Sequence, residues 1–252
     1  MSKQPSSHQS NQASAKLVEI ERSGEVLQFT LNNPDRGNEV TGTMFDAMLA
    51  ELRSESSQAR ARVLRIRASG KVFCTGRERA GRDAETVRAE AARLIEFKRA
   101  VRTTSLITVA EVQGDAFGFG FGLAIVCDFV LVADEVALGF PEMRSGLAPA
   151  AIMAYLGEYT LPRFAFPMIL FGDPIDAQRA LQIGLISQVV VAKDLSREAD
   201  ALVARILKLD GGAARRCKEF FLAAQNHSFE QNCKVAVEAL TAGTMAALGR
   251  NK

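Results

Sequence analysis

The sequence predicts an α/β domain that ends in a helical region. Short apolar runs with the period of a strand alternate with helical stripes from residue 27 to about residue 148. After Pro149 helical patterns dominate, interrupted by glycine and proline. Because no linker rich in Pro, Gly or Ser divides the 252 residues, we expect one core over residues 16–195, followed by helices over 196–252.

The strands are predicted from alternation of apolar and polar residues. Leu27, Phe29 and Leu31 alternate with polar side chains, and the pattern stops before Pro34. Later runs are more uniformly apolar, as expected for strands that are covered on both faces. The predicted strands cover residues 27–31, 64–68, 106–112, 129–133, 136–140 and 187–191.

The helices are predicted from apolar stripes and their N-terminal caps. Thr41 precedes a stripe formed by Met44, Met48 and Leu52, so a helix is expected to begin there. Further helices are expected over residues 83–103, 195–207, 213–225 and 229–248. Residues 1–15 are rich in Ser, Gln and Asn without an apolar segment, which is typical of a disordered leader and not of a secretory signal.

Composition excludes several function classes. A net charge of +2 gives no basic surface for nucleic acid, and no apolar stretch is long enough for a membrane span. With only two histidines, His8 and His227, a Ser-His-Asp or Cys-His triad has almost no candidate base. The four cysteines lie far apart, so we expect no metal site and reduced thiols in a cytoplasmic protein.

Two glycine-rich segments resemble nucleotide-binding motifs without matching them. The run 118–122 fails the G-x-G-x-x-G pattern in every register, and the segment 76–81 continues with Arg82-Asp83 instead of Lys-Ser/Thr. Glycines between a strand and a helix can still expose backbone N–H groups to an anion. From composition alone, tight turns are the preferred explanation of both segments.

Five segments, read in order, resemble motifs of the enoyl-CoA hydratase/isomerase (crotonase) family. Asn33-Pro34-Asp35-Arg36-Gly37-Asn38 resembles its N-x-P-[ED]-[KR]-x-N motif. The others resemble F-x-x-G-x-[DE], V-N-G-x-A-x-G-G-G-x-x-L-A-x-x-C-D, x-P-E-x-x-x-G-x-x-P and a final motif ending in G-L-[VI]; they occupy residues 63–78, 112–128, 140–149 and 171–186. The resemblance covers about residues 17–218.

The resemblance implies a spiral of ββα-like units with two crossing sheets, and C-terminal helices that build a homotrimer or a homohexamer. It also implies an acyl-CoA thioester as the substrate, with no cofactor beyond the coenzyme A of that substrate. The implied catalytic residues are Glu142 as the acid or base, with the backbone N–H groups of Arg77 and Phe119 as an oxyanion hole. The implied substrate-binding residues are Arg36, Asn38, Thr75, Gly76, Gly118 and Gly122.

The sequence departs from the family pattern at the catalytic positions. Hydratases of the family carry two glutamates, whereas this chain has Gly122 at the first position and Glu142 at the second. Hydration divides its proton transfers between two carboxylates, while one carboxylate can remove and return a proton. The chain is therefore expected to be an isomerase, unless another acid, such as Glu78 or Asp115, reaches the site.

Several alternatives stay open at this point. Within the family, the activity could be hydration or hydrolysis of a thioester or carbon–carbon bond. A non-catalytic acyl-CoA-binding protein and, with less support, a nucleotide-dependent oxidoreductase come from other classes. Glu142 alone could be an N-terminal helix carboxylate, and Arg77, Arg79 and Arg82 could be a solvated charged run or contact CoA phosphates. Packing or structural roles are expected for Phe117, Phe119, Phe121, Asp128, Cys74 and Cys127.

Overall fold

A six-stranded sheet forms the centre of the computed structural model, which describes residues 17–250. The predicted leader at residues 1–15 lies outside the described residues. The strand order is β1-β2-β3-β4-β6-β9, and all neighbours are parallel except β1 and β2. These strands are β1 (Val18–Ser23), β2 (Val26–Leu31), β3 (Val63–Ala68), β4 (Ile107–Val112), β6 (Phe129–Ala133) and β9 (Gln188–Val190).

Strand β1 is an addition to the predicted elements. Val18 and Ile20 alternate with Glu19 and Glu21, and this alternation is the signal that the prediction overlooked. The strand pairs with β2 in antiparallel register and forms one edge of the sheet. The other predicted strands are confirmed, with small differences at their ends.

A second, three-stranded sheet has the order β5-β7-β8, formed by β5 (Ala116–Phe117), β7 (Ala137–Gly139) and β8 (Ile175–Asp176). Isolated bridges join Cys74 to Ala116 and Val40 to Arg77, so the chain near these residues continues this layer. After a strand of the large sheet, the chain repeatedly enters this second layer and then a helix. This repetition is the predicted spiral of ββα-like units.

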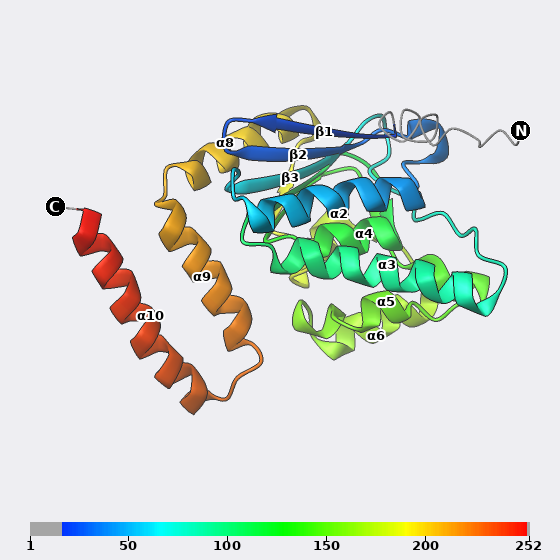
Figure 1. The fold of residues 1–252 in the computed structure, drawn as a ribbon. Coiled ribbons are helices and arrows are strands. Elements are labelled where there is room, and N and C mark those ends of the chain that lie inside the picture. Colours follow the sequence, from blue (N-terminus) through cyan, green and yellow to red (C-terminus); the bar gives the residue numbers. More distant parts are fainter. Residues whose placement is uncertain (1–16, 251–252) are drawn as a thin grey trace, which may run out of the picture.

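The helices α2 (Gly42–Ser57), α3 (Ala84–Thr103) and α4 (Phe119–Ile125) lie below the large sheet in Figure 1. The Thr41 hydroxyl accepts a hydrogen bond from the N–H of Met44, and the Asp83 carboxylate caps α3 through the N–H groups of Glu85 and Thr86. Both predicted N-terminal boundaries are confirmed because they are set by local hydrogen bonds. Helix α4 begins inside the glycine-rich run and is buried throughout.

The second half of the chain is mostly helical. Short helices follow β7: η2 (Pro141–Ser145), α5 (Ala150–Met153), η3 (Leu156–Glu158), α6 (Pro162–Phe171), α7 (Ala177–Gln182) and η4 (Ala192–Asp194). A further short helix, η1 (Pro34–Arg36), lies in the first half. The C-terminal helices are α8 (Leu195–Leu207), α9 (Gly211–Ala224) and α10 (Phe229–Arg250). Helix α8 packs on β4 and β6, whereas α9 and α10 extend away from the sheet (Figure 1).

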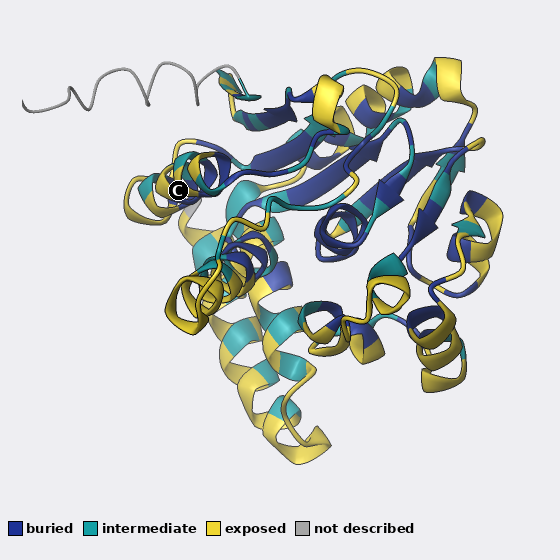
Figure 2. Ribbon diagram, turned by 90° about the vertical axis from the view of Figure 1, so that its right-hand side faces the viewer, coloured by how far each residue is buried: buried dark blue, intermediate teal, exposed yellow. Residues whose placement is uncertain are grey.

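Burial follows this arrangement. In Figure 2 both sheets and α4 are buried, while α9 and α10 are mostly exposed or half-buried. The exposed apolar side chains of these two helices include Phe221, Phe229, Val237 and Leu240. Within residues 17–250, no helix combines the length and the apolar character that a bilayer crossing requires. The division of the chain at residue 195 stays a prediction.

Candidate active site

Glu142 lies against the backbone of Gly118, at the beginning of α4. Glu142 is the second residue of η2, and its Oε1 is 2.9 Å from the position that a Cβ on Gly118 would occupy. Gly118 has φ +53° and ψ −115°, a conformation that side chains with a Cβ rarely adopt. A side chain at position 118 would therefore strain the turn and also displace the carboxyl group. Oε2 of Glu142 is buried and has no hydrogen-bond partner among the described residues.

The backbone N–H groups of Arg77 and Phe119 lie next to the second sheet, in the segment that follows Cys74 and at the beginning of α4. The two segments are joined by the Cys74–Ala116 bridge and by a hydrogen bond of 2.9 Å from the Phe117 N–H to the Cys74 carbonyl. Phe119 is the first residue of α4, where N–H groups have no partner within the helix. Neither N–H donates a hydrogen bond to any residue in 17–250. Both are therefore free to bind an oxygen atom.

Gly122 faces two side chains that the sequence reading overlooked. A Cβ at this position would lie 2.3 Å from Nζ of Lys98 and 2.8 Å from the hydroxyl of Tyr155. Nζ of Lys98 donates to that hydroxyl at 2.6 Å, and the hydroxyl donates to the Gly122 carbonyl at 3.0 Å. An amine and a phenol thus occupy the place that a side chain at position 122 would need.

Burial changes the protonation of this pair. Removal from water lowers the pKa of Lys98 from 10.5 to about 7, and the charge of Glu142 opposes this shift without overcoming it. Burial also raises the pKa of Tyr155 above its ordinary value. The signal for Lys98 was present in the sequence, because it shares a helix face with Leu94, Phe97 and Val101, all of which are buried.

The residues predicted beside coenzyme A gather at one edge of the molecule, in the loops that follow β2 and β3. Arg36 is exposed and forms ion pairs with Glu39 and Glu78 at 3.1 and 3.7 Å. The N–H of Thr75 donates to the Gly37 carbonyl at 2.9 Å, which joins the two loops. The carbonyl of Gly76 accepts from the N–H of Val40 at 3.1 Å.

The side chain of Asn38 is buried and hydrogen-bonded within the protein, so it is not exposed to a ligand. It is fully buried, with φ +56°, and its Nδ2 donates to the carbonyls of Ser69 and Val72 at 2.8 and 2.7 Å. Its Oδ1 accepts from the N–H of Asn33 at 2.8 Å. With these bonds its side chain holds the two loops together, so any effect on a ligand would act through the position of the loops.

The other candidates occupy structural positions. The Arg77 guanidinium pairs with Glu90 at 3.3 Å, and Asp115 accepts from the N–H of Ala137 at 2.8 Å. Burial raises the pKa of both Cys74 and Cys127 to about 12, so both thiols stay protonated near neutral pH. The side chains of Phe119 and Phe121 are buried in aromatic contacts, as expected for packing residues.

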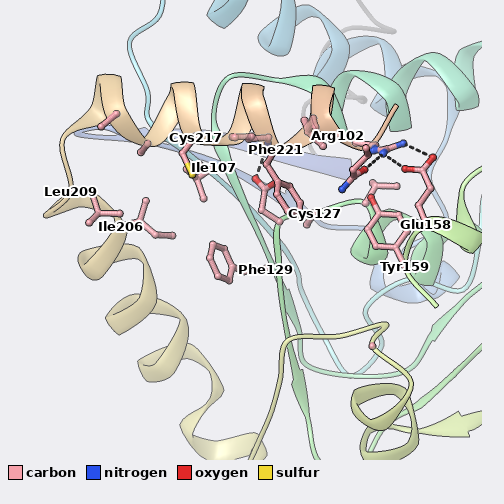
Figure 3. Close-up of a pocket in the computed structure, with 18 of the residues that line it drawn as sticks. Arg102, Ile107, Cys127, Phe129, Glu158, Tyr159, Ile206, Leu209, Cys217 and Phe221 are labelled. Atoms are coloured by element: carbon pink, nitrogen blue, oxygen red, sulfur yellow. Dashed lines mark hydrogen bonds and ion pairs between the residues drawn. The ribbon is translucent and has the colours of Figure 1, made fainter. Parts of the chain in front are cut away.

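A cavity of about 750 Å³ lies elsewhere, between α9 and the large sheet. Figure 3 shows Cys217 and Phe221 on the side of α9 that faces this cavity, with Arg102, Glu158 and Tyr159 at one end. Its lining is mostly apolar and includes none of the predicted site residues. This cavity is therefore separate from the surroundings of Glu142.

Comparison with known proteins identifies the family. The sequence model described as enoyl-CoA hydratase/isomerase matches residues 21–246. The chain belongs to this family. A Mycobacterium bovis relative named "Probable enoyl-CoA hydratase echA8" is 31% identical over 223 residues, covering 84% of this chain and 82% of the relative. The predicted membership of the enoyl-CoA hydratase/isomerase family is confirmed.

Solved structures confirm the predicted fold. An enoyl-CoA hydratase of Mycobacterium smegmatis is similar with a TM-score of 0.87 at 24% identity, over 91% of each chain. A Thermobifida fusca protein solved in complex with CoA is 29% identical, with a TM-score of 0.84 over 95% of this chain and 97% of that one. The two-sheet spiral is thus the fold of the enoyl-CoA hydratase/isomerase family.

Proposed function

We propose that the protein is an acyl-CoA enzyme that moves the double bond of an enoyl-CoA thioester, with Glu142 as the base. The observation that carries this proposal is the buried, unpartnered Oε2 of Glu142 beside Gly118, together with glycine at position 122. A carboxylate oxygen without a hydrogen bond is available to accept a proton. With no carboxylate at position 122, the site lacks the pair that divides the proton transfers of hydration.

The chemistry begins with the acidity of the hydrogen next to the thioester carbonyl. When Glu142 removes this proton, negative charge moves to the carbonyl oxygen, and two N–H donors would stabilise it there. The free N–H groups of Arg77 and Phe119 support this role. One donor of this kind is worth about 3–4 kcal/mol of the barrier. Both are backbone groups, so the unusual side chains at these positions do not remove them.

The binding of coenzyme A is proposed for the edge formed by the loops after β2 and β3. Arg36 offers an exposed guanidinium for a phosphate, while Thr75 and Gly76 lie where the loops meet. Family membership and the CoA complex of the Thermobifida fusca protein support this assignment. Coenzyme A enters as part of the substrate, and we propose no other cofactor.

A homotrimer, or a homohexamer of two trimers, is proposed from the exposed helices α9 and α10. Their exposed apolar side chains include Phe221, Phe229, Val237, Leu240 and Met245, with exposed fractions between 61% and 78%. A row of large apolar side chains on extended helices is typical of a protein–protein interface. Covering it with a second copy of the chain would remove this surface from water.

The direct test is Glu142→Gln, which keeps the shape of the side chain and removes its basicity. We expect turnover of a 3-enoyl-CoA to fall by about 10²–10⁴-fold, the usual contribution of a positioned acid or base. Binding of a saturated acyl-CoA, measured by calorimetry, should persist. Glu135→Gln is the matched control, because Glu135 is exposed. Unchanged turnover in the Glu142→Gln variant would contradict the assignment of the base.

Hydration is the second candidate, because relatives such as the Mycobacterium bovis protein bear the name hydratase. The two activities differ in what happens to a conjugated 2-enoyl-CoA. A hydratase removes its conjugated absorbance by adding water, whereas an isomerase converts it only to the equilibrium mixture of positional isomers. Complete loss of that absorbance from crotonyl-CoA, with a 3-hydroxyacyl-CoA as the product, would favour hydration.

A further inference from the structure

Lys98 brings a buried amine into the candidate site. Only 4% of this residue is exposed, and its Nζ has one neutral hydrogen-bond partner, the hydroxyl of Tyr155. No carboxylate within residues 17–250 forms an ion pair with it. Burying an ammonium group without a counter-charge lowers the stability of a fold. Packing alone therefore gives no reason for a lysine at this position.

The amine and the Glu142 carboxyl lie at two neighbouring points on the first turn of α4. Nζ of Lys98 is 2.3 Å from the Cβ position of Gly122, and Oε1 of Glu142 is 2.9 Å from that of Gly118. The Gly122 N–H donates to the Gly118 carbonyl at 3.0 Å, so these glycines are one helical turn apart. The two groups form no ion pair among the described residues, so Nζ of Lys98 and the Glu142 carboxylate oxygens lie more than 4.0 Å apart.

We propose that Lys98 is the second proton-transfer group of the site and acts on the opposite end of the allylic unit from Glu142. This inference rests on the proposed isomerase function and extends it. A 3-enoyl thioester would lie between the two groups, with C2 facing Glu142 and C4 facing Lys98. Glu142 then removes a proton, and Lys98, instead of Glu142, supplies the one that completes the reaction.

The protons and electrons of this proposed double-bond shift balance. Glu142 takes a proton from C2, and the electrons of the C2–H bond form a dienolate whose charge rests on the thioester oxygen. As the carbonyl reforms, the C2=C3 bond forms, and the electrons of the C3=C4 bond take a proton from Nζ at C4. Glu142 ends as a carboxylic acid and Lys98 as a neutral amine. Transfer of one proton from the acid to the amine through solvent restores both groups.

The surroundings of Lys98 suit an ammonium that gives up a proton. Its Nζ lies 5.3 Å from the ring centre of Phe119 and 5.1 Å from that of Tyr155, contacts that stabilise a cation. Burial has lowered its pKa to about 7, so the amine form is also accessible. Glu142, Cys74 and Tyr155 are the titratable groups that face it, and burial keeps the last two neutral by raising their pKa values.

Tyr155 is a positioning residue in this proposal. Its hydroxyl accepts from Nζ and donates to the Gly122 carbonyl, so it fixes the amine against α4. Tyr155→Phe removes this hydroxyl and leaves the ring in place. We expect turnover to fall by about 10–100-fold, because a hydrogen bond from a charged donor stabilises more than a neutral one.

The decisive experiment compares the origin of the hydrogen at C4 in the wild type and in Lys98→Met. With a substrate that carries deuterium at C2 in ordinary water, the wild-type product should contain no deuterium at C4, because Lys98 exchanges its protons with solvent. Lys98→Met should reduce turnover by about 10²–10⁴-fold. Its remaining product should carry label moved from C2 to C4 by Glu142. Methionine is apolar and of similar length, so the variant should fold; Lys98→Gln provides a second test.

A second measurement separates Lys98 from the rest of the site. Exchange of the C2 hydrogen of a saturated acyl-CoA in heavy water needs Glu142 but not Lys98. We expect this exchange in the wild type and in Lys98→Met, and its loss in Glu142→Gln. In the wild type, turnover should fall as the pH rises through about 7, and this fall should be absent in Lys98→Met. Arg99→Met, an exposed change on the same helix, is the control.

The possible failures are distinct. If Lys98→Met keeps wild-type turnover, or if the wild type itself moves the label from C2 to C4, Lys98 is not the proton donor, while the proposed isomerase function stands. If the wild type neither isomerises a 3-enoyl-CoA nor exchanges the C2 hydrogen, the proposed function fails, and the role of Lys98 fails with it.

Discussion

Two buried lysines, Lys98 and Lys218, show how differently this fold treats the same side chain. Lys218 lies on α9, and its Nζ donates to Oδ2 of Asp128 and to the Leu106 carbonyl, both at 2.7 Å. The same Asp128 oxygen also accepts bonds from the N–H and the hydroxyl of Thr108. Lys98 lies on α3 and has only the Tyr155 hydroxyl. Lys218 forms an ion pair with Asp128, whereas Lys98 has no ion-pair partner within residues 17–250.

The two environments indicate different roles for the two lysines. Around Lys218, every interaction ties α9 to the ends of β4 and β6, so the ion pair serves the fold. Around Lys98, the missing counter-charge costs stability and leaves an amine that can exchange protons. A buried polar group without full compensation is typical of an active site, where function and stability compete.

The largest effect is expected for Lys218→Met, measured against Lys98→Met. Lys218→Met leaves the Asp128 carboxylate, whose side chain is 24% exposed, without its cation, and loss of a hydrogen bond to a charged group costs about 1.5–3 kcal/mol. Lys98→Met removes an amine that has no counter-charge, so the free energy of unfolding of this variant should equal that of the wild type or exceed it. Urea unfolding of both variants measures this contrast. Equal destabilisation would remove the distinction between the two lysines.

The pH dependence of stability should also distinguish Lys98. Its pKa is about 7 in the folded state and 10.5 in the unfolded chain, so the unfolded state holds more protons between these values. Stability therefore rises with pH across this window, by at most about 1.4 kcal/mol per pH unit from this one group. The difference between the unfolding free energies of the wild type and of Lys98→Met at each pH gives the contribution of this one group. A flat difference from pH 7 to 10 would contradict the lowered pKa.

A smaller effect is expected for Gly122→Ala. The added methyl group would meet Nζ of Lys98 at 2.3 Å and the Tyr155 hydroxyl at 2.8 Å, so the end of the lysine must move. Because that end is flexible, we expect a stability change of about 1 kcal/mol or less, within the ordinary range for single substitutions. Turnover should fall more than stability, since the amine is displaced. Gly157→Ala, where nothing lies within 4 Å of the new Cβ, is the control.

Local signals explain most of what the sequence predicted correctly. Thr41 and Asp83 form caps with residues two or three positions away, so the start of each helix is set within a few residues. The alternation in β2 and the apolar runs of β4 and β6 are equally local. Strand β1 has the same kind of signal, because Val18 and Ile20 alternate with charged residues, so this strand was also predictable from the sequence.

The family motifs in the sequence pointed to Glu142, Arg77 and Phe119 as the catalytic residues, which stays a prediction, and the structure places Glu142 and Phe119 at the beginning of α4. The role of each residue still depends on contacts that span the chain. Asn38 is an example, because the family resemblance implied a ligand contact, whereas its partners Ser69 and Val72 lie 31 and 34 residues away. Only the fold reveals that this side chain is fully occupied.

The sequence by itself determined the family, most of the strands and helices in their order, and the presence of Glu142 together with glycine at position 122. The tertiary structure decided which side chains, those of Lys98 and Tyr155, lie beside that glycine. Lys98 lies on α3, Gly122 on α4 and Tyr155 in the turn before η3, and 57 residues separate the lysine from the tyrosine. Both side chains come from segments that are far from Gly122 in the sequence. Which side chains lie beside this glycine is therefore determined only when the helices pack together.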